Sequence, residues 1–95
     1  MFDQMKQLME MKKQADQLKK ELEGLIIESN DINGIKITLN GALNFKSLEV
    51  SEGLLASDKK RLENELTRGV NAAIKKAQQK AAEKMKGMLP GLPGF

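Results

Sequence analysis

The spacing of the apolar residues changes twice along this 95-residue chain, and that change limits the folds it can adopt. Near the amino terminus, apolar residues alternate at intervals of three and four: Leu8, Met11, Ala15, Leu18, Leu22 and Leu25. This heptad-like seam predicts an amphipathic helix over residues 2–23 that ends at Gly24. A second helical stripe consists of Leu62, Leu66, Val70, Ala73, Ala77, Ala81 and Met85. It predicts a second long helix whose later turns present mostly alanine.

The middle of the chain has the period of β-strands instead. Residues 35–39 alternate strictly between apolar and polar side chains, and residues 25–29 and 44–50 are also rich in strand-forming types. Asn-Gly pairs at 33–34 and 40–41 flank the central segment and favour turns. Three antiparallel strands in a meander are therefore predicted. Phe45 falls on the opposite parity from Leu48 and Val50, so either a bulge reconciles them or Phe45 faces elsewhere.

The boundaries of the second helix carry further signals. Residues 51–56 predict a short turn that buries Leu54 and Leu55, and Ser57 is a suitable cap for a helix that starts at Asp58. Gly69 inside this helix costs about 1 kcal/mol relative to alanine, which is tolerable if a neighbouring element packs there.

The predicted fold class is α+β, a single domain over 1–95 with the order α-β-β-β-α. Its parts are an N-terminal helix (1–24), a β-meander and turn (25–57), a C-terminal helix (58–87) and a flexible tail (88–95).

The lengths of the two helices predict a projecting arm. Helices of 22 and 29 residues span about 33 and 44 Å, whereas five-residue strands span about 17 Å. Both helices must overhang the sheet, and they are expected to pair antiparallel along the leucine seam and the alanine stripe. The basic residues from 75 to 86 would then lie near the tip of the arm. Because so short a chain with three Phe and no Trp or Tyr has little core, a homodimer is expected.

Several classes of function are disfavoured by what the chain lacks. There is no cysteine and no histidine, so no metal site and no cofactor are expected. The glycines form no phosphate-binding loop, and no segment suggests a buried carboxyl group in a pocket, so an enzyme with a small-molecule substrate is not expected. No apolar run exceeds three residues, as at 25–27, and no secretory signal is evident, so we expect a cytoplasmic protein without a membrane span.

Positive charge is concentrated in the last third of the chain. Residues 1–24 are neutral overall, residues 25–57 carry a balance of −2, and residues 58–95 carry +5. Within 68–86 a single acid, Glu83, opposes six basic residues: Arg68, Lys75, Lys76, Lys80, Lys84 and Lys86. Lys76, Lys80 and Lys84 are four apart and share one helix face. Such a surface attracts polyanions, although a lysine-rich helix face can also be merely solvated.

Several segments together resemble one known family. The sequences ITLNGA (37–42), LEVS (48–51) and LL (54–55), Asp58, and VNAAIKKA (70–77) are similar to the signature of YbaB/EbfC nucleoid-associated proteins. The resemblance extends over nearly the whole chain in the same order, with Gly69 as one departure from the pattern. It implies an α-β-β-β-α subunit, a tweezer-like homodimer, and association with DNA in the bacterial nucleoid.

Charge and resemblance together predict which residues would contact double-stranded DNA. They are the six basic residues of 68–86 and, towards the expected tip, Lys6, Lys12 and Lys13. Lysines contact phosphates without reading bases, so little sequence specificity is expected, with effects on DNA conformation and gene expression. The alternative is an adaptor or chaperone-like dimer with no nucleic-acid role, whose helical seam and methionine-rich tip hold other proteins.

Overall fold

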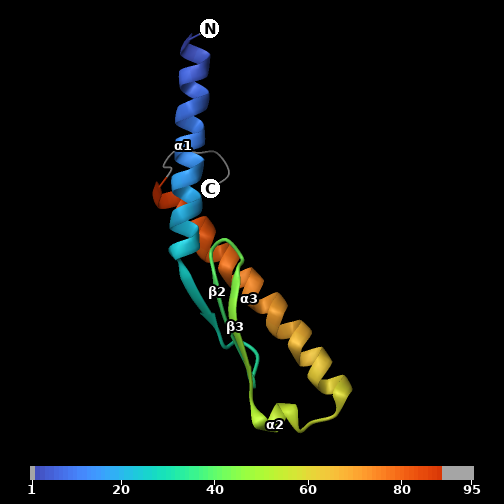
Figure 1. Ribbon diagram of the computed structural model, residues 1–95. Coiled ribbons are helices and arrows are strands. Elements are labelled where there is room, and N and C mark those ends of the chain that lie inside the picture. Colours follow the sequence, from blue (N-terminus) through green and yellow to red (C-terminus); the bar gives the residue numbers. More distant parts are fainter. Residues whose placement is uncertain (1, 89–95) are drawn as a thin grey trace.

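The computed structural model describes residues 2–88. The elements are, in chain order, α1 (Phe2–Gly24), β1 (Ile26–Ser29), β2 (Ile35–Asn40), β3 (Phe45–Val50), α2 (Glu52–Leu55) and α3 (Lys59–Met88). The predicted α-β-β-β-α order is confirmed, with the one-turn helix α2 added before α3. The molecule measures 63 × 20 × 19 Å because α1 projects beyond the sheet (Figure 1). Of the predicted tail 88–95, Met88 closes α3 and residues 89–95 lie outside the described part.

The core lies between one face of the sheet and α3. The sheet is antiparallel with strand order β1-β2-β3, and α3 crosses its β1 and β2 strands (Figure 1). Ile35, Ile37 and Leu39 of β2 are at most 4% exposed, and they pack with the buried Ala73 and Ala77 of α3. Small alanine side chains let the helix approach closely, so branched residues of the sheet supply most of the buried apolar area.

A β-bulge settles the orientation of Phe45. Thr38 pairs with Ser47, but the next residue of β2, Leu39, pairs with Phe45, so Lys46 is the extra residue in β3. Directly paired residues share a face of the sheet. Phe45 therefore lies on the same face as Leu48 and Val50, as the bulge interpretation requires.

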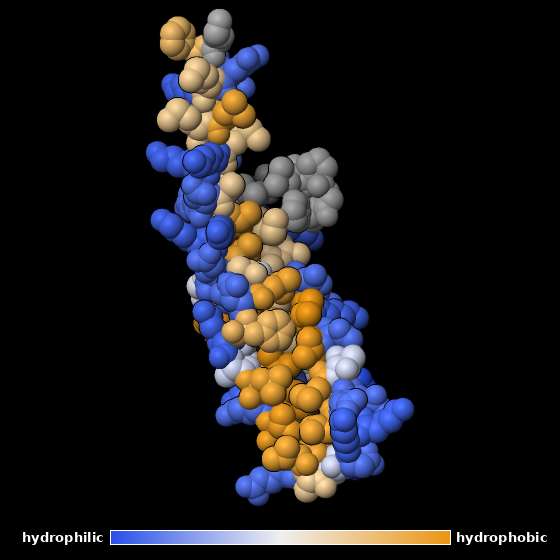
Figure 2. Space-filling view, turned by 45° about the vertical axis from the view of Figure 1, so that its right-hand side comes forward, coloured by the Kyte–Doolittle hydropathy of each residue, from blue (hydrophilic) through white to orange (hydrophobic). Residues whose placement is uncertain are grey.

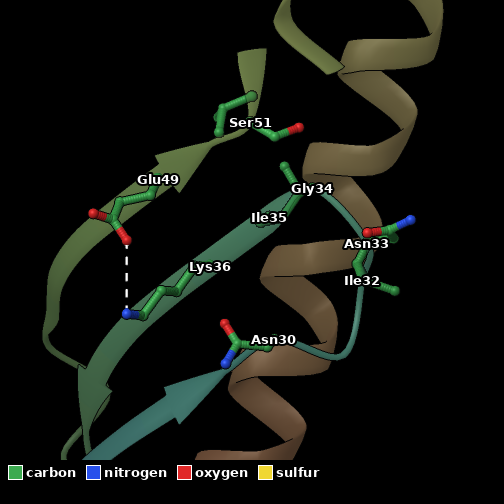
Figure 3. Close-up of a pocket in the computed structure, with 9 residues that line it drawn as sticks. Asn30, Ile32, Asn33, Gly34, Ile35, Lys36, Glu49 and Ser51 are labelled. Atoms are coloured by element: carbon green, nitrogen blue, oxygen red, sulfur yellow. Dashed lines mark ion pairs between the residues drawn. The ribbon is translucent and has the colours of Figure 1, made fainter. Parts of the chain in front are cut away.

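The opposite face of the sheet is mostly polar, with Ile26 as an exposed apolar residue. Lys36 of β2 lies between Glu28 of β1 and Glu49 of β3, with Nζ to carboxylate distances of 3.9 Å to each. Figure 3 shows the Lys36–Glu49 pair beside a shallow pocket lined by the loop between β1 and β2. All three side chains are about half exposed or more, so the pairs contribute little to stability. This face is solvated rather than packed.

The base of α1 is fixed to the hairpin between β2 and β3. The buried Asn40 side chain donates from its amide to the Glu23 carbonyl and to Asn44 Oδ1, both at 3.2 Å. Its Oδ1 accepts from the backbone N–H groups of Ala42 (3.0 Å) and Asn44 (2.9 Å). One side chain thus satisfies four polar groups, and it ties the last turn of α1 to the hairpin.

Gly41 makes the second connection at this joint. Its backbone N–H donates to the carbonyls of Leu22 (2.9 Å) and Leu25 (3.0 Å). A Cβ at position 41 would lie 3.0 Å from the Leu22 carbonyl oxygen, so the glycine permits the close approach of the two backbones. The left-handed backbone of this turn is at Leu43 (φ 66°) rather than at Gly41.

The predicted pairing of the two helices is wrong over most of its length. The alanine stripe of α3 packs on the sheet, and α1 has no buried residue. Leu8 and Met11 of the seam are 65% and 64% exposed. The helices meet only near the base of α1, where Lys84 Nζ lies 3.5 Å from a Glu21 carboxylate oxygen. The isoleucines of the sheet offer α3 more apolar area to bury than a narrow leucine seam does.

Two local predictions also need correction. Leu54 is buried as expected, but Leu55 is 63% exposed, because α2 turns only one side towards the sheet. The cap of α3 is Asp58 rather than Ser57: Asp58 Oδ1 accepts from the Arg61 N–H at 2.7 Å. The Ser57 hydroxyl instead donates to the carbonyl of Leu54 and closes α2.

Gly69 lies tightly against Ile35 of the sheet, and this contact yields a testable prediction. A Cβ at this position would lie 2.7 Å from Ile35 Cγ2, inside contact distance. We expect Gly69→Ala to lower the free energy of unfolding by roughly 1 to 2 kcal/mol, because the overpacking exceeds the gain in helix propensity. Urea denaturation at fixed protein concentration measures this. Gly87→Ala is the matched control: among the described residues, no atom outside the adjoining helix backbone lies within 4 Å of its Cβ, so it should leave stability unchanged or raise it. A Gly69→Ala protein as stable as the wild type would contradict the packing.

Candidate nucleic-acid interface

Three of the predicted lysines converge on one side of α3. Lys75, Lys76 and Lys80 line a shallow pocket together with Gln79 and Glu83 of the same helix. The pocket also includes Asp31, which follows β1, so this side of α3 faces the β1 edge of the sheet. We call Arg68, Lys75, Lys76 and Lys80 the basic flank.

The structure fixes one of these side chains in place. Lys76 Nζ donates to the backbone carbonyl of Glu28 in β1 at 2.7 Å. Lys80 Nζ lies 3.8 Å from a Glu83 carboxylate oxygen, an exposed pair that competes weakly with other anions. Among residues 2–88, no acidic group lies within ion-pair distance of Lys75. The ammonium groups are therefore available for an external anion, and Lys76 is positioned by the sheet.

The remaining basic residues of the set extend along the same helix. Arg68 lies two turns before Lys76, and its Nη1 is 3.0 Å from Glu65 Oε1. Lys84 contacts Glu21 of α1, and Lys86 is exposed in the last turn of α3. From residue 68 to residue 86 the helix advances about 27 Å. A length of about 27 Å of duplex DNA carries about 16 phosphate charges, enough for every basic residue of the set.

The α1 lysines form a separate group. Lys6, Lys12 and Lys13 are exposed on the free part of α1, around Met9 and Glu10. Lys75 and Lys76 lie instead over the sheet, so the expectation that the basic segment of 75–86 lies at the tip of an arm is wrong for its beginning. The reason is the packing of α3 on β1 and β2. The structure thus divides the predicted residues between α3 and the projecting part of α1 (Figure 1).

Sequence reasoning did not identify a second exposed surface, which is apolar. Phe45 and Leu48 of β3 are 44% and 46% exposed, although they share the face of the sheet that packs on α3. Together with the half-buried Val50, Val70 and Ile74 they make up what we call the apolar β3 surface. Figure 2 shows a continuous hydrophobic band over the sheet end of the molecule, bordered by hydrophilic side chains. The parity of Phe45 left a bulge as one of two alternatives, and the bulge at Lys46 is what brings Phe45 to this face.

Other chemistry has little support in the described part of the chain. Within residues 2–88, no group of three or more acidic side chains could hold a metal ion. None of the helices in that range combines the length and apolar character needed to span a bilayer. The pocket of Figure 3 has a single basic and a single acidic side chain, Lys36 and Glu49, and the two pair with each other.

Fold and charge together define a class. Basic side chains clustered along one side of a long helix are typical of proteins that bind a polyanion through its phosphates. Comparison with known families makes this specific: the profile of the YbaB/EbfC DNA-binding family matches residues 1–92. The chain belongs to this family, and it is a DNA-binding protein of the nucleoid-associated type. The match disfavours the alternative of an adaptor or chaperone-like module without a nucleic-acid role.

Proposed function

We propose that this protein binds duplex DNA with little sequence specificity, as a cytoplasmic homodimer at the nucleoid and without catalysis. The observation that carries the proposal is the convergence of Lys75, Lys76 and Lys80 on one side of α3. Lysine contacts phosphates as a point charge and does not read base edges bidentately. Of the two arginines, Arg68 is already paired with Glu65, and Arg61 lies in the first turn of α3. Few side chains on α3 could therefore distinguish one sequence from another.

The homodimer is supported by the apolar β3 surface. A subunit that leaves two large apolar side chains of its main sheet nearly half exposed gains by covering them. β3 is also an edge strand, with one row of backbone groups unpaired in the sheet. A second copy supplies an identical surface, and a twofold axis brings the two together. The resulting dimer would alter DNA conformation and gene expression by occupying and holding DNA.

Binding through phosphates makes a quantitative prediction about salt. Six phosphate contacts, one from each basic residue between positions 68 and 86, predict a slope of about −5 in a plot of log K against log salt concentration. Affinity for a random-sequence duplex should thus fall about 1000-fold between about 50 and about 200 mM salt. Mobility-shift titrations measure this. Duplexes of unrelated sequence should bind within a few-fold of each other. Failure to shift any duplex at about 50 mM salt would reject the proposed function.

A further inference from the structure

Between residues 68 and 82, the two sides of α3 that flank its buried column differ in charge. Gly69, Ala73, Ala77 and Ala81 form the buried column of the helix at intervals of four. At about 100° per residue, positions directly before and directly after this column lie on opposite sides of the helix. The preceding positions hold Arg68, Ala72, Lys76 and Lys80. The following positions hold Val70, Ile74, Gln78 and Ala82, none of them charged.

The contact of Lys76 shows which side faces which strand. Its ammonium group donates to the Glu28 carbonyl of β1, so the basic flank overhangs the β1 edge. The uncharged side must then face β3, at the opposite edge of the sheet. There Val70 and Ile74 adjoin the side of the sheet that carries Phe45 and Leu48. The apolar β3 surface and the basic flank consequently lie at opposite edges of each subunit.

This arrangement constrains how a dimer can hold DNA. A second copy seated on the apolar β3 surface leaves the basic flank uncovered, because the body of α3 separates the two. Twofold symmetry then places the partner's basic flank on the far side of the assembly. Each basic flank faces away from the dimer axis rather than into a space between the subunits.

We propose that one dimer binds two separate duplexes, one on the basic flank of each subunit, and so bridges them instead of enclosing a single duplex between its arms. This inference rests on the proposed function, since it assumes that the basic flank binds DNA. The two surfaces then have different roles. The basic flank determines the affinity for each duplex, and the apolar β3 surface forms the dimer that joins two duplexes.

A bridging assay tests the proposal. One duplex is attached to beads, a labelled duplex is added in solution, and the protein is titrated in. The wild-type protein should retain the labelled duplex at the concentrations that produce a mobility shift. In Phe45→Gln/Leu48→Gln, retention should fall at least tenfold and sedimentation should show a monomer, while the mobility shift changes only a few-fold. Ile26→Gln is the matched control, because Ile26 is an exposed apolar residue on the opposite face of the sheet.

The outcomes separate the inference from the proposed function. Wild-type protein that shifts one duplex but retains no second duplex overturns bridging and leaves DNA binding intact. A double variant that is monomeric and still bridges, or that remains dimeric, also overturns it. Loss of the shift on every duplex rejects the proposed function instead. Circular dichroism verifies folding, and Leu48→Gln alone replaces the double variant if that one does not fold.

Discussion

Reversing the charge of Lys75, Lys76 and Lys80 to glutamate is expected to weaken binding to random-sequence duplex DNA by at least about 100-fold at low salt. Each lost contact to a phosphate accounts for about 1 kcal/mol, and the new carboxylates repel the duplex. The salt dependence should change as well, its slope decreasing in magnitude by about 3, one for each lysine removed. Mobility-shift titrations at several salt concentrations measure both quantities.

A matched triple variant distinguishes this surface from net charge. Lys46, Lys59 and Lys60 are also exposed, but they lie on the bulge of β3 and in the first turn of α3, away from the basic flank. Their replacement by glutamate changes the net charge by the same amount. When both variants are compared at about 100 mM salt, we expect an affinity loss of less than about tenfold for this one, because long-range attraction is then screened beyond about 10 Å. Equal losses in the two triple variants would show that net charge alone determines binding.

The second large effect is expected for stability. Asn40→Ala should lower the free energy of unfolding by about 2 to 4 kcal/mol, because the backbone N–H groups of Ala42 and Asn44 and the carbonyl of Glu23 lose their partner in a buried site. Urea denaturation at fixed protein concentration measures the loss. Asn30→Ala provides the comparison, since Asn30 is exposed, and a change below about 0.5 kcal/mol is expected there. An equal decrease in the free energy of unfolding in Asn40→Ala and Asn30→Ala would show that the hydrogen bonds of Asn40 do not stabilise the protein.

Most of the fold could be predicted from the sequence, because the spacing of apolar residues and the turn residues identify helices, strands and turns from short stretches of the chain. The heptad-like seam predicted α1, the alternation of residues 35–39 predicted β2, and Gly24 ended the first helix as expected. Phe45 is different. Its parity, opposite to that of Leu48 and Val50, indicates either a bulge or a different orientation, and only the pairing of β2 with β3 decides for the bulge.

The position of α3 could not be predicted for a related reason. A stripe of alanines fits closely against any apolar surface, so it is compatible with both the seam of α1 and the sheet. The burial of Ile35 and Ile37 against α3 favours the sheet, and this comparison of areas requires the tertiary structure. Leu55 is a similar case, because only the direction of α2 determines which of two adjacent leucines is buried.

The candidate site was visible in the sequence as a concentration of charge but not as a surface. The shared face of Lys76, Lys80 and Lys84 follows from helical spacing alone. That the basic flank overhangs β1 becomes evident only from the contact between Lys76 and the Glu28 carbonyl, which joins residues 48 positions apart. The opposition between the basic flank and the apolar β3 surface follows from that contact, so it lies beyond what a single sequence reveals.

Asn40 and Gly41 attach α1 to the rest of the protein at its last turn, and the other end of the helix projects freely. The helix has 23 residues and extends about 34 Å from this joint. A rotation of about 10° at the joint therefore displaces its free end by about 6 Å, close to one full helical turn. Lys76 is held by its contact with the Glu28 carbonyl, whereas Lys6 would move with the free end of α1 in such a rotation. The protein thus combines cations that lie against the sheet with cations whose distance from them depends on the angle between α1 and the sheet.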